Sequence, residues 1–139
     1  MLLIMDKKQA KLEYKASRQP MGVFAIRNLV DEKVFVGSSM NLSAIFNRIR
    51  FQLFAGAHPL KSLESDWKLL GSGKFEFEVL EELVPRDDPN YNYAADLETL
   101  EDLWLEKLEP YDDKGYNERK KTREERLRII AANRSGPPA

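Results

Sequence analysis

Residues 21–38 contain two short apolar segments separated by a polar turn, and they constrain the fold more than any other part of the chain. Residues 21–29 and 33–38 are rich in β-branched and aromatic side chains, and the turn residues "VDEK" lie between them. This pattern is typical of two strands joined as a hairpin. We therefore expect the fold to be built around a small sheet.

A helix is expected directly after the hairpin, over residues 42–54. Asn41 is a suitable N-cap, and Gly56 follows as a stop signal. Apolar residues recur between them at helical spacing, so that one stripe of the helix faces a core. The stripe consists of Leu42, Ile45, Phe46, Ile49 and Leu53.

Further elements follow in alternating order. A second helix is predicted over 60–71, and a third strand over 75–83 with Phe75, Phe77 and Val79 on its inner side. Another helix is predicted from Asp96 to the residue before Pro110. The predicted fold class is α+β, with a small three-stranded mixed or antiparallel sheet flanked by helices in the order β-β-α-α-β-α.

The composition excludes several classes of chemistry. The 139 residues include no cysteine, which excludes disulfides, cysteine-based zinc sites and thiol catalysis, and His58 is the only histidine. No apolar run approaches the roughly 20 residues of a membrane span, so we expect no membrane contact and a cytoplasmic protein.

Charge is unevenly distributed along the chain although the net charge is only −1. Residues 1–62 contain ten Lys/Arg and four Asp/Glu, residues 63–113 contain four and sixteen, and residues 114–139 contain eight and three. Two basic ends therefore flank an acidic middle. Such ends can contact an anion, or they can be neutralised by the acidic segment within the fold or in a dimer.

The hairpin tripeptides Gly22–Val23–Phe24 and Phe35–Val36–Gly37, ten residues apart, carry a family resemblance. Together with the capped helix, the "FEFEVLEEL" strand, a glutamate-bearing helix and "GYN" at 115–117, they resemble the GIY-YIG nuclease domain. The resemblance covers residues 21–117. It leaves residues 1–20 as a basic N-terminal arm or helix, and residues 118–139 as a basic C-terminal helix and tail.

The resemblance implies phosphodiester hydrolysis that depends on Mg²⁺ or Mn²⁺. In that family the tyrosines of the two tripeptides assist the nucleophile, an arginine on the first helix clamps phosphate, and a later glutamate holds the metal. Here the tyrosine positions are Phe24 and Phe35, and the arginine position is Ile45. A phenyl ring has no oxygen that could accept or donate a proton.

Three residues at family positions keep polar side chains. By resemblance, Glu101 is the candidate metal ligand, and Asn117 and His58 are candidate site residues. Arg48 lies three residues after Ile45, about 60° away around the helix, and its long side chain can substitute for the missing clamp.

Other basic residues are candidates for nucleic-acid contact. Arg27 projects from the first strand and Arg50 from the first helix. The start of the last helix adds Arg119, Lys120, Lys121 and Arg123.

Three functional hypotheses remain open. The first is a degenerate GIY-YIG-like domain that has lost efficient hydrolysis and binds nucleic acid or a protein. The second is a divergent Mg²⁺-dependent DNA endonuclease that uses Glu101 and Arg48. The third is a homodimeric structural protein, and under it or the first hypothesis no metal is required.

Overall fold

The computed structural model describes residues 19–119 and 123–135. Most of the predicted N-terminal arm, with residues 1–18, lies outside the described residues. Lys120, Lys121 and the tail residues 136–139 also lie outside them.

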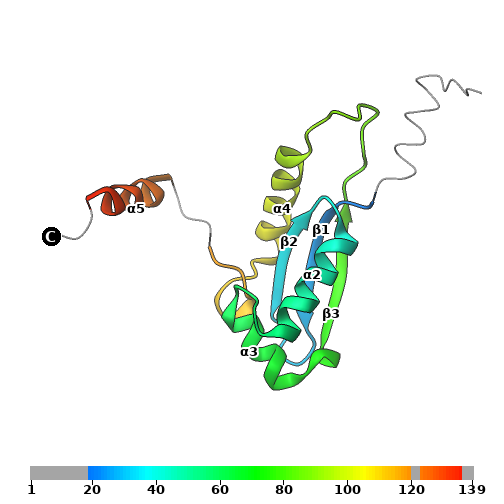
Figure 1. Cartoon of the computed structure of the whole chain (residues 1–139), viewed down its shortest axis with the longest axis vertical. Coiled ribbons are helices and arrows are strands. Elements are labelled where there is room, and N and C mark those ends of the chain that lie inside the picture. Colours follow the sequence, from blue (N-terminus) through cyan, green and yellow to red (C-terminus); the bar gives the residue numbers. More distant parts are fainter. Residues whose placement is uncertain (1–18, 120–122, 136–139) are drawn as a thin grey trace, which may run out of the picture.

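The centre of the fold is a three-stranded sheet in the order β2-β1-β3 (Figure 1). The strands are β1 (Gly22–Asn28), β2 (Val34–Ser39) and β3 (Phe75–Glu82), and both pairings are antiparallel. The predicted hairpin is confirmed, with Phe24 opposite Gly37 and Ile26 opposite Phe35. The sheet is thus antiparallel, and its central strand is β1.

Four helices accompany the sheet among the described residues. They are α2 (Leu42–Ala55), α3 (Lys61–Leu70), α4 (Ala94–Leu108) and α5 (Arg123–Ser135), with short 3₁₀ turns at Ser72–Lys74 and Asp112–Lys114. The predicted caps of α2 are confirmed, because the Asn41 side chain accepts from the Ala44 N–H and Gly56 has a left-handed φ of 71°. The α+β prediction is confirmed.

The helix α4 begins two residues earlier than predicted. The Leu97 N–H donates to the Tyr93 carbonyl, and the Asn92 side chain accepts from the Ala94 N–H. Asp96 therefore lies within the first turn, where its charge favours the helix N-terminus, and it accepts a hydrogen bond from the Tyr91 hydroxyl.

The two faces of the sheet pack against different helices. Successive residues of a strand point to opposite faces. Phe24 and Ile26 join a core with Leu53 of α2 and Leu63 of α3, whereas Val23 packs with Leu105 of α4 on the other face. The apolar stripe predicted for α2 lies in the first of these cores.

Val79 pairs with Phe24 of β1 and so lies on the same face of the sheet as Phe75 and Phe77, as predicted, but it is not buried. Its side chain is 43% exposed. The pairing of β1 with β3 shifts register between Val23 and Phe24, which face this part of β3. The prediction is thus confirmed for the side of the strand and wrong for the burial of Val79.

Candidate functional site

A cleft of about 430 Å³ opens between α2, α4, the hairpin and the loop that follows α2. Five predicted site residues line it together, although they come from distant parts of the chain. They are Phe24, Phe35, Arg48, His58 and Glu101. The fold therefore brings five of the six predicted catalytic positions into one place, and Asn117 is the exception.

The floor of the cleft is apolar. Phe24, Phe35, Ile45 and Ile49 line it, and the rings of Phe24 and Phe35 lie 6.1 Å apart between centroids. Phe24 is only 2% exposed, and a Cβ atom at Gly37 would lie 2.7 Å from its Cζ atom. The glycine of the second tripeptide is thus required for the close approach of the Phe24 ring. None of these four side chains carries an oxygen.

Arg48 supplies the positive charge of the cleft. It is exposed, and it has no ion pair or hydrogen bond to any residue that the structure describes. An unpaired guanidinium can form two parallel hydrogen bonds to a phosphate. The arginine therefore presents an available anion-binding group at the wall of the cleft.

His58 lines the cleft, and its ring is held by a backbone N–H. Its ring is 4% exposed, and its Nδ1 atom accepts the Leu60 N–H at 3.0 Å. Burial lowers the pKa of His58 below the ordinary 6.5. Because Nδ1 accepts, the neutral ring carries its proton on Nε2, and that atom can donate but cannot act as a base.

Glu64 is a buried residue that was not predicted from the sequence. Its carboxylate is held by Lys61 at 3.1 Å and Lys68 at 3.2 Å, and hydrogen bonds from these lysines lower the pKa of Glu64. Gly56 lies at the start of the loop that carries His58. A Cβ atom added at Gly56 would lie 3.4 Å from one oxygen of Glu64. The sequence signal that could have identified this carboxylate is the pair of lysines three residues before and four residues after Glu64.

Glu101 is the carboxylate of the cleft and is half-buried on α4. Within residues 19–119 and 123–135, no group of three or more His, Asp or Glu side chains could hold a metal ion. Mg²⁺ is often held by only one or two carboxylates together with substrate phosphates and water. The donor set thus fits Mg²⁺ or Mn²⁺ only when a phosphate completes the coordination, and Glu101 would be its protein ligand.

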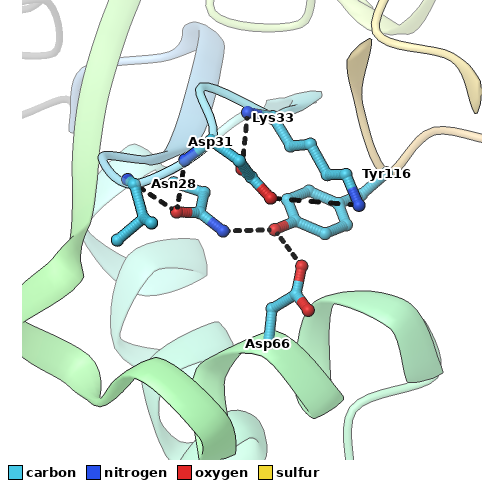
Figure 2. Close-up of polar contacts among 6 residues, drawn as sticks. Asn28, Asp31, Lys33, Asp66 and Tyr116 are labelled. Atoms are coloured by element: carbon cyan, nitrogen blue, oxygen red, sulfur yellow. Dashed lines mark hydrogen bonds and ion pairs between the residues drawn. The ribbon is translucent and has the colours of Figure 1, made fainter. Parts of the chain in front are cut away.

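Tyr116 and Asn117 of "GYN" have internal partners and are not among the residues that line the cleft. The Tyr116 hydroxyl donates to Asp66 of α3 at 2.7 Å and accepts from the Asn28 side chain at 3.0 Å (Figure 2). The Asn117 side chain accepts from the Val36 N–H and donates to the Val36 carbonyl, each at 2.8 Å. We call Asn28, Asp66, Tyr116 and Asn117 the Tyr116 lock, because they fasten the segment after α4 to the hairpin and to α3.

The other predicted nucleic-acid contacts that the structure describes lie away from the cleft. Arg27 pairs with Glu78 at 2.6 Å on the sheet face opposite Phe24, and Arg119 pairs with Asp112 at 2.9 Å. Arg50 stacks on Phe77, on another side of α2. Lys120, Lys121 and the Arg123 side chain lie outside the described residues.

The strand order and the helices define a small α+β domain. It resembles the catalytic domain of the homing endonuclease I-TevI, with a TM-score of 0.60 and 25% identity over 72% of this chain and 99% of that domain. A mutant of the catalytic domain of the intron endonuclease I-TevI gives 0.61 and 26%, over 75% and 98%.

The described domain is therefore GIY-YIG-like, as the tripeptides predicted. No protein-family model matches the chain, and no curated protein matches it. In the described part of the chain, no helix is long and apolar enough to cross a membrane.

Proposed function

We propose that this domain binds nucleic acid through the cleft and has lost efficient phosphodiester hydrolysis. One observation carries the proposal: the cleft keeps a free arginine and a histidine donor above a floor in which phenylalanines occupy the tyrosine positions. Recognition of a phosphate needs donors and positive charge, whereas hydrolysis also needs a base. The cleft has the first set of groups, whereas among its lining residues only the Glu101 carboxylate could accept a proton, and that group is the candidate metal ligand.

The binding groups suit a phosphodiester. Arg48 provides a bidentate donor, and His58 provides a single N–H at Nε2. The apolar floor lowers the local dielectric constant and so strengthens both contacts. Glu101 would repel a phosphate unless a divalent cation lies between them, so we expect Mg²⁺ or Mn²⁺ to increase affinity.

Hydrolysis is impaired because no group of the cleft floor can accept a proton. Phe24 and Phe35 have no hydroxyl, and His58 already carries a proton on the nitrogen that is not bonded to Leu60. A positioned general base contributes roughly 10²- to 10⁴-fold to a rate. A bound divalent ion would supply charge neutralisation at phosphate and would lower the pKa of a bound water, but the hydroxyls absent at positions 24 and 35 would still be missing.

A divergent active endonuclease is the second candidate. The observation in its favour is that Arg48, His58 and Glu101 lie in the same cleft. In this alternative the metal and Arg48 would stabilise the transition state, and water in the cleft would be the nucleophile. The homodimer hypothesis stays a prediction.

The test combines binding and cleavage by the full chain. Affinity for a duplex DNA of fixed length should fall log-linearly with salt concentration. Arg48→Gln should reduce that slope by about one, because one phosphate contact is lost. Arg119→Gln is the matched control, since this arginine is already paired with Asp112 outside the cleft.

Incubation with Mg²⁺ or Mn²⁺ and supercoiled plasmid should give no cleavage. Cleavage that disappears in Glu101→Ala would overturn impaired hydrolysis and support the second candidate. A wild-type protein without measurable binding at low salt would overturn the binding function.

A further inference from the structure

A second hollow lies on another side of α2, and it differs from the cleft in its lining. We call it the aromatic groove. It measures about 570 Å³, within the size range of ligand pockets, and α2, α3 and β3 line it. Its main lining residues are Arg50, Phe51, Phe54, Trp67, Phe75 and Phe77. Arg48 and Arg50 are two positions apart, about 200° around the helix, so α2 presents one arginine to each hollow.

The aromatic groove exposes an unusual amount of aromatic surface. Phe54 is 86% exposed and Phe51 is 72% exposed. Deeper in the groove, the ring of Trp67 lies 5.1 Å from that of Phe75 and 6.2 Å from that of Phe77. Contiguous exposed apolar surface of this kind is typical of a binding site, because an ordinary solvent-facing helix exposes apolar side chains only singly.

The charge of the aromatic groove is positive. The Arg50 guanidinium lies 4.2 Å from the Phe77 ring centroid and 5.9 Å from that of Phe46. It has no ion-pair partner among the described residues, and no acidic side chain lines the groove. A guanidinium held flat on a ring can accept a further flat ring on its free face and can bind a phosphate at its edge.

We propose that the aromatic groove stacks the unpaired bases of single-stranded nucleic acid. Bases supply flat apolar rings for the phenylalanines, and the linking phosphates supply the anion for Arg50. An apolar peptide would cover the rings but leave the guanidinium without an anion. The proposal extends the proposed function and rests on it, because it assumes that the cleft engages the backbone of the same nucleic acid.

The experiment uses Trp67 as the reporter of stacking. In a Trp104→Phe background Trp67 is the only tryptophan of the chain. Titration with oligo(dT) should quench its fluorescence. Phe54→Ala and Phe51→Ala should each weaken oligo(dT) binding roughly 5- to 150-fold, the range for loss of one base–aromatic contact. Circular dichroism and thermal unfolding verify that both variants fold.

Two controls isolate the groove from the rest of the surface. Leu69→Ala removes an 81% exposed side chain of α3 that does not line the groove, and it should leave oligo(dT) affinity unchanged. An abasic oligonucleotide of equal length keeps the phosphates but has no bases. On this probe, Phe54→Ala should bind as well as the wild type.

The outcomes separate the groove from the cleft. If Arg48→Gln weakens duplex binding while Phe51→Ala and Phe54→Ala leave oligo(dT) affinity unchanged, the groove proposal is wrong and the proposed function stands. An equal loss on the abasic probe would also overturn stacking. If Phe54→Ala instead converts a dimer to a monomer without changing DNA affinity, the groove is a self-association surface and the proposal fails.

Discussion

The cleft and the Tyr116 lock both place aromatic residues beside the same hairpin, but they differ in the hydroxyl group. In the lock, the Tyr116 hydroxyl is buried and has both a donor and an acceptor as partners. In the cleft, Phe24 and Phe35 have no hydroxyl at all. A buried hydroxyl without partners costs free energy, whereas a phenyl ring only packs. The comparison indicates that the lock uses its oxygen for stability, whereas the phenylalanines of the cleft floor contribute packing and no hydroxyl.

Restoring the missing polar groups is the sharpest way to break this comparison, and it should have the largest effect. We expect the triple variant Phe24→Tyr, Phe35→Tyr, Ile45→Arg to cleave supercoiled plasmid with Mg²⁺ at a rate at least about 10²-fold above the detection limit that bounds the wild type, because a base and a phosphate clamp would be present in one cleft. Adding Glu101→Ala should abolish the gain. A folded, DNA-binding triple variant without cleavage would show that these three side chains are not sufficient for hydrolysis in this cleft.

Removing the amide of Asn117 tests the opposite side of the comparison. Asn117→Ala should lower the free energy of unfolding by about 2–5 kcal/mol, because the N–H and the carbonyl of Val36 both lose their partner. Urea unfolding measures the change. Asn117→Asp keeps the acceptor and loses the donor, so its loss should be smaller. Equal stability of the alanine variant and the wild type would contradict the role given to the lock.

Tyr116→Phe removes only the hydroxyl and should lower the free energy of unfolding by less, about 1–3 kcal/mol. Asn28 and Asp66 then lose one hydrogen-bond partner each. Burial is the main cause that raises the pKa of Tyr116 above its ordinary 10.0. Above pH 10 the unfolded chain therefore loses this proton first, and the free energy of unfolding falls as pH rises. Urea unfolding between pH 8 and pH 11 should show a weaker pH slope in Tyr116→Phe than in the wild type. Identical slopes would contradict the buried hydroxyl.

The smallest expected effect concerns His58. Burial lowers its pKa, so the unfolded chain takes up a proton first as pH falls below 6.5, and stability decreases. His58→Asn keeps an acceptor for the Leu60 N–H but does not titrate. Thermal unfolding between pH 7.5 and 5.5 should show a flatter profile in this variant. If stability instead fell more steeply with decreasing pH in His58→Asn than in the wild type, the native His58 ring would be protonated.

The order of elements was predictable from local patterns. The caps Asn41 and Gly56 and the apolar stripe between them define α2 without reference to the rest of the molecule. The hairpin likewise follows from its alternation and its polar turn. The start of α4 was misplaced because Asp96 is a good first-turn residue as well as a good cap, and only the Tyr93 carbonyl shows where the helix begins.

The candidate site was predictable only through the spacing of its tripeptides. Periodicity places Phe24, Phe35 and Ile45 in a core, which is true of their packing, but it says nothing of the cleft beside them. Glu64 was missed because a buried carboxylate is the exception among acidic residues, and its two lysines look like ordinary surface charges.

The sequence by itself determined the hairpin, the helices and the absence of hydroxyls at positions 24 and 35, because these depend on neighbouring residues or on side-chain chemistry alone. Only the tertiary structure decided which polar groups have a partner within the protein and which do not. Arg48 and Arg27 are equally charged in the sequence, yet packing leaves the first unpaired at the cleft and joins the second to Glu78. Arg27 and Glu78 are 51 residues apart in the sequence, and the pairing of their strands brings them together, which no local sequence pattern indicates.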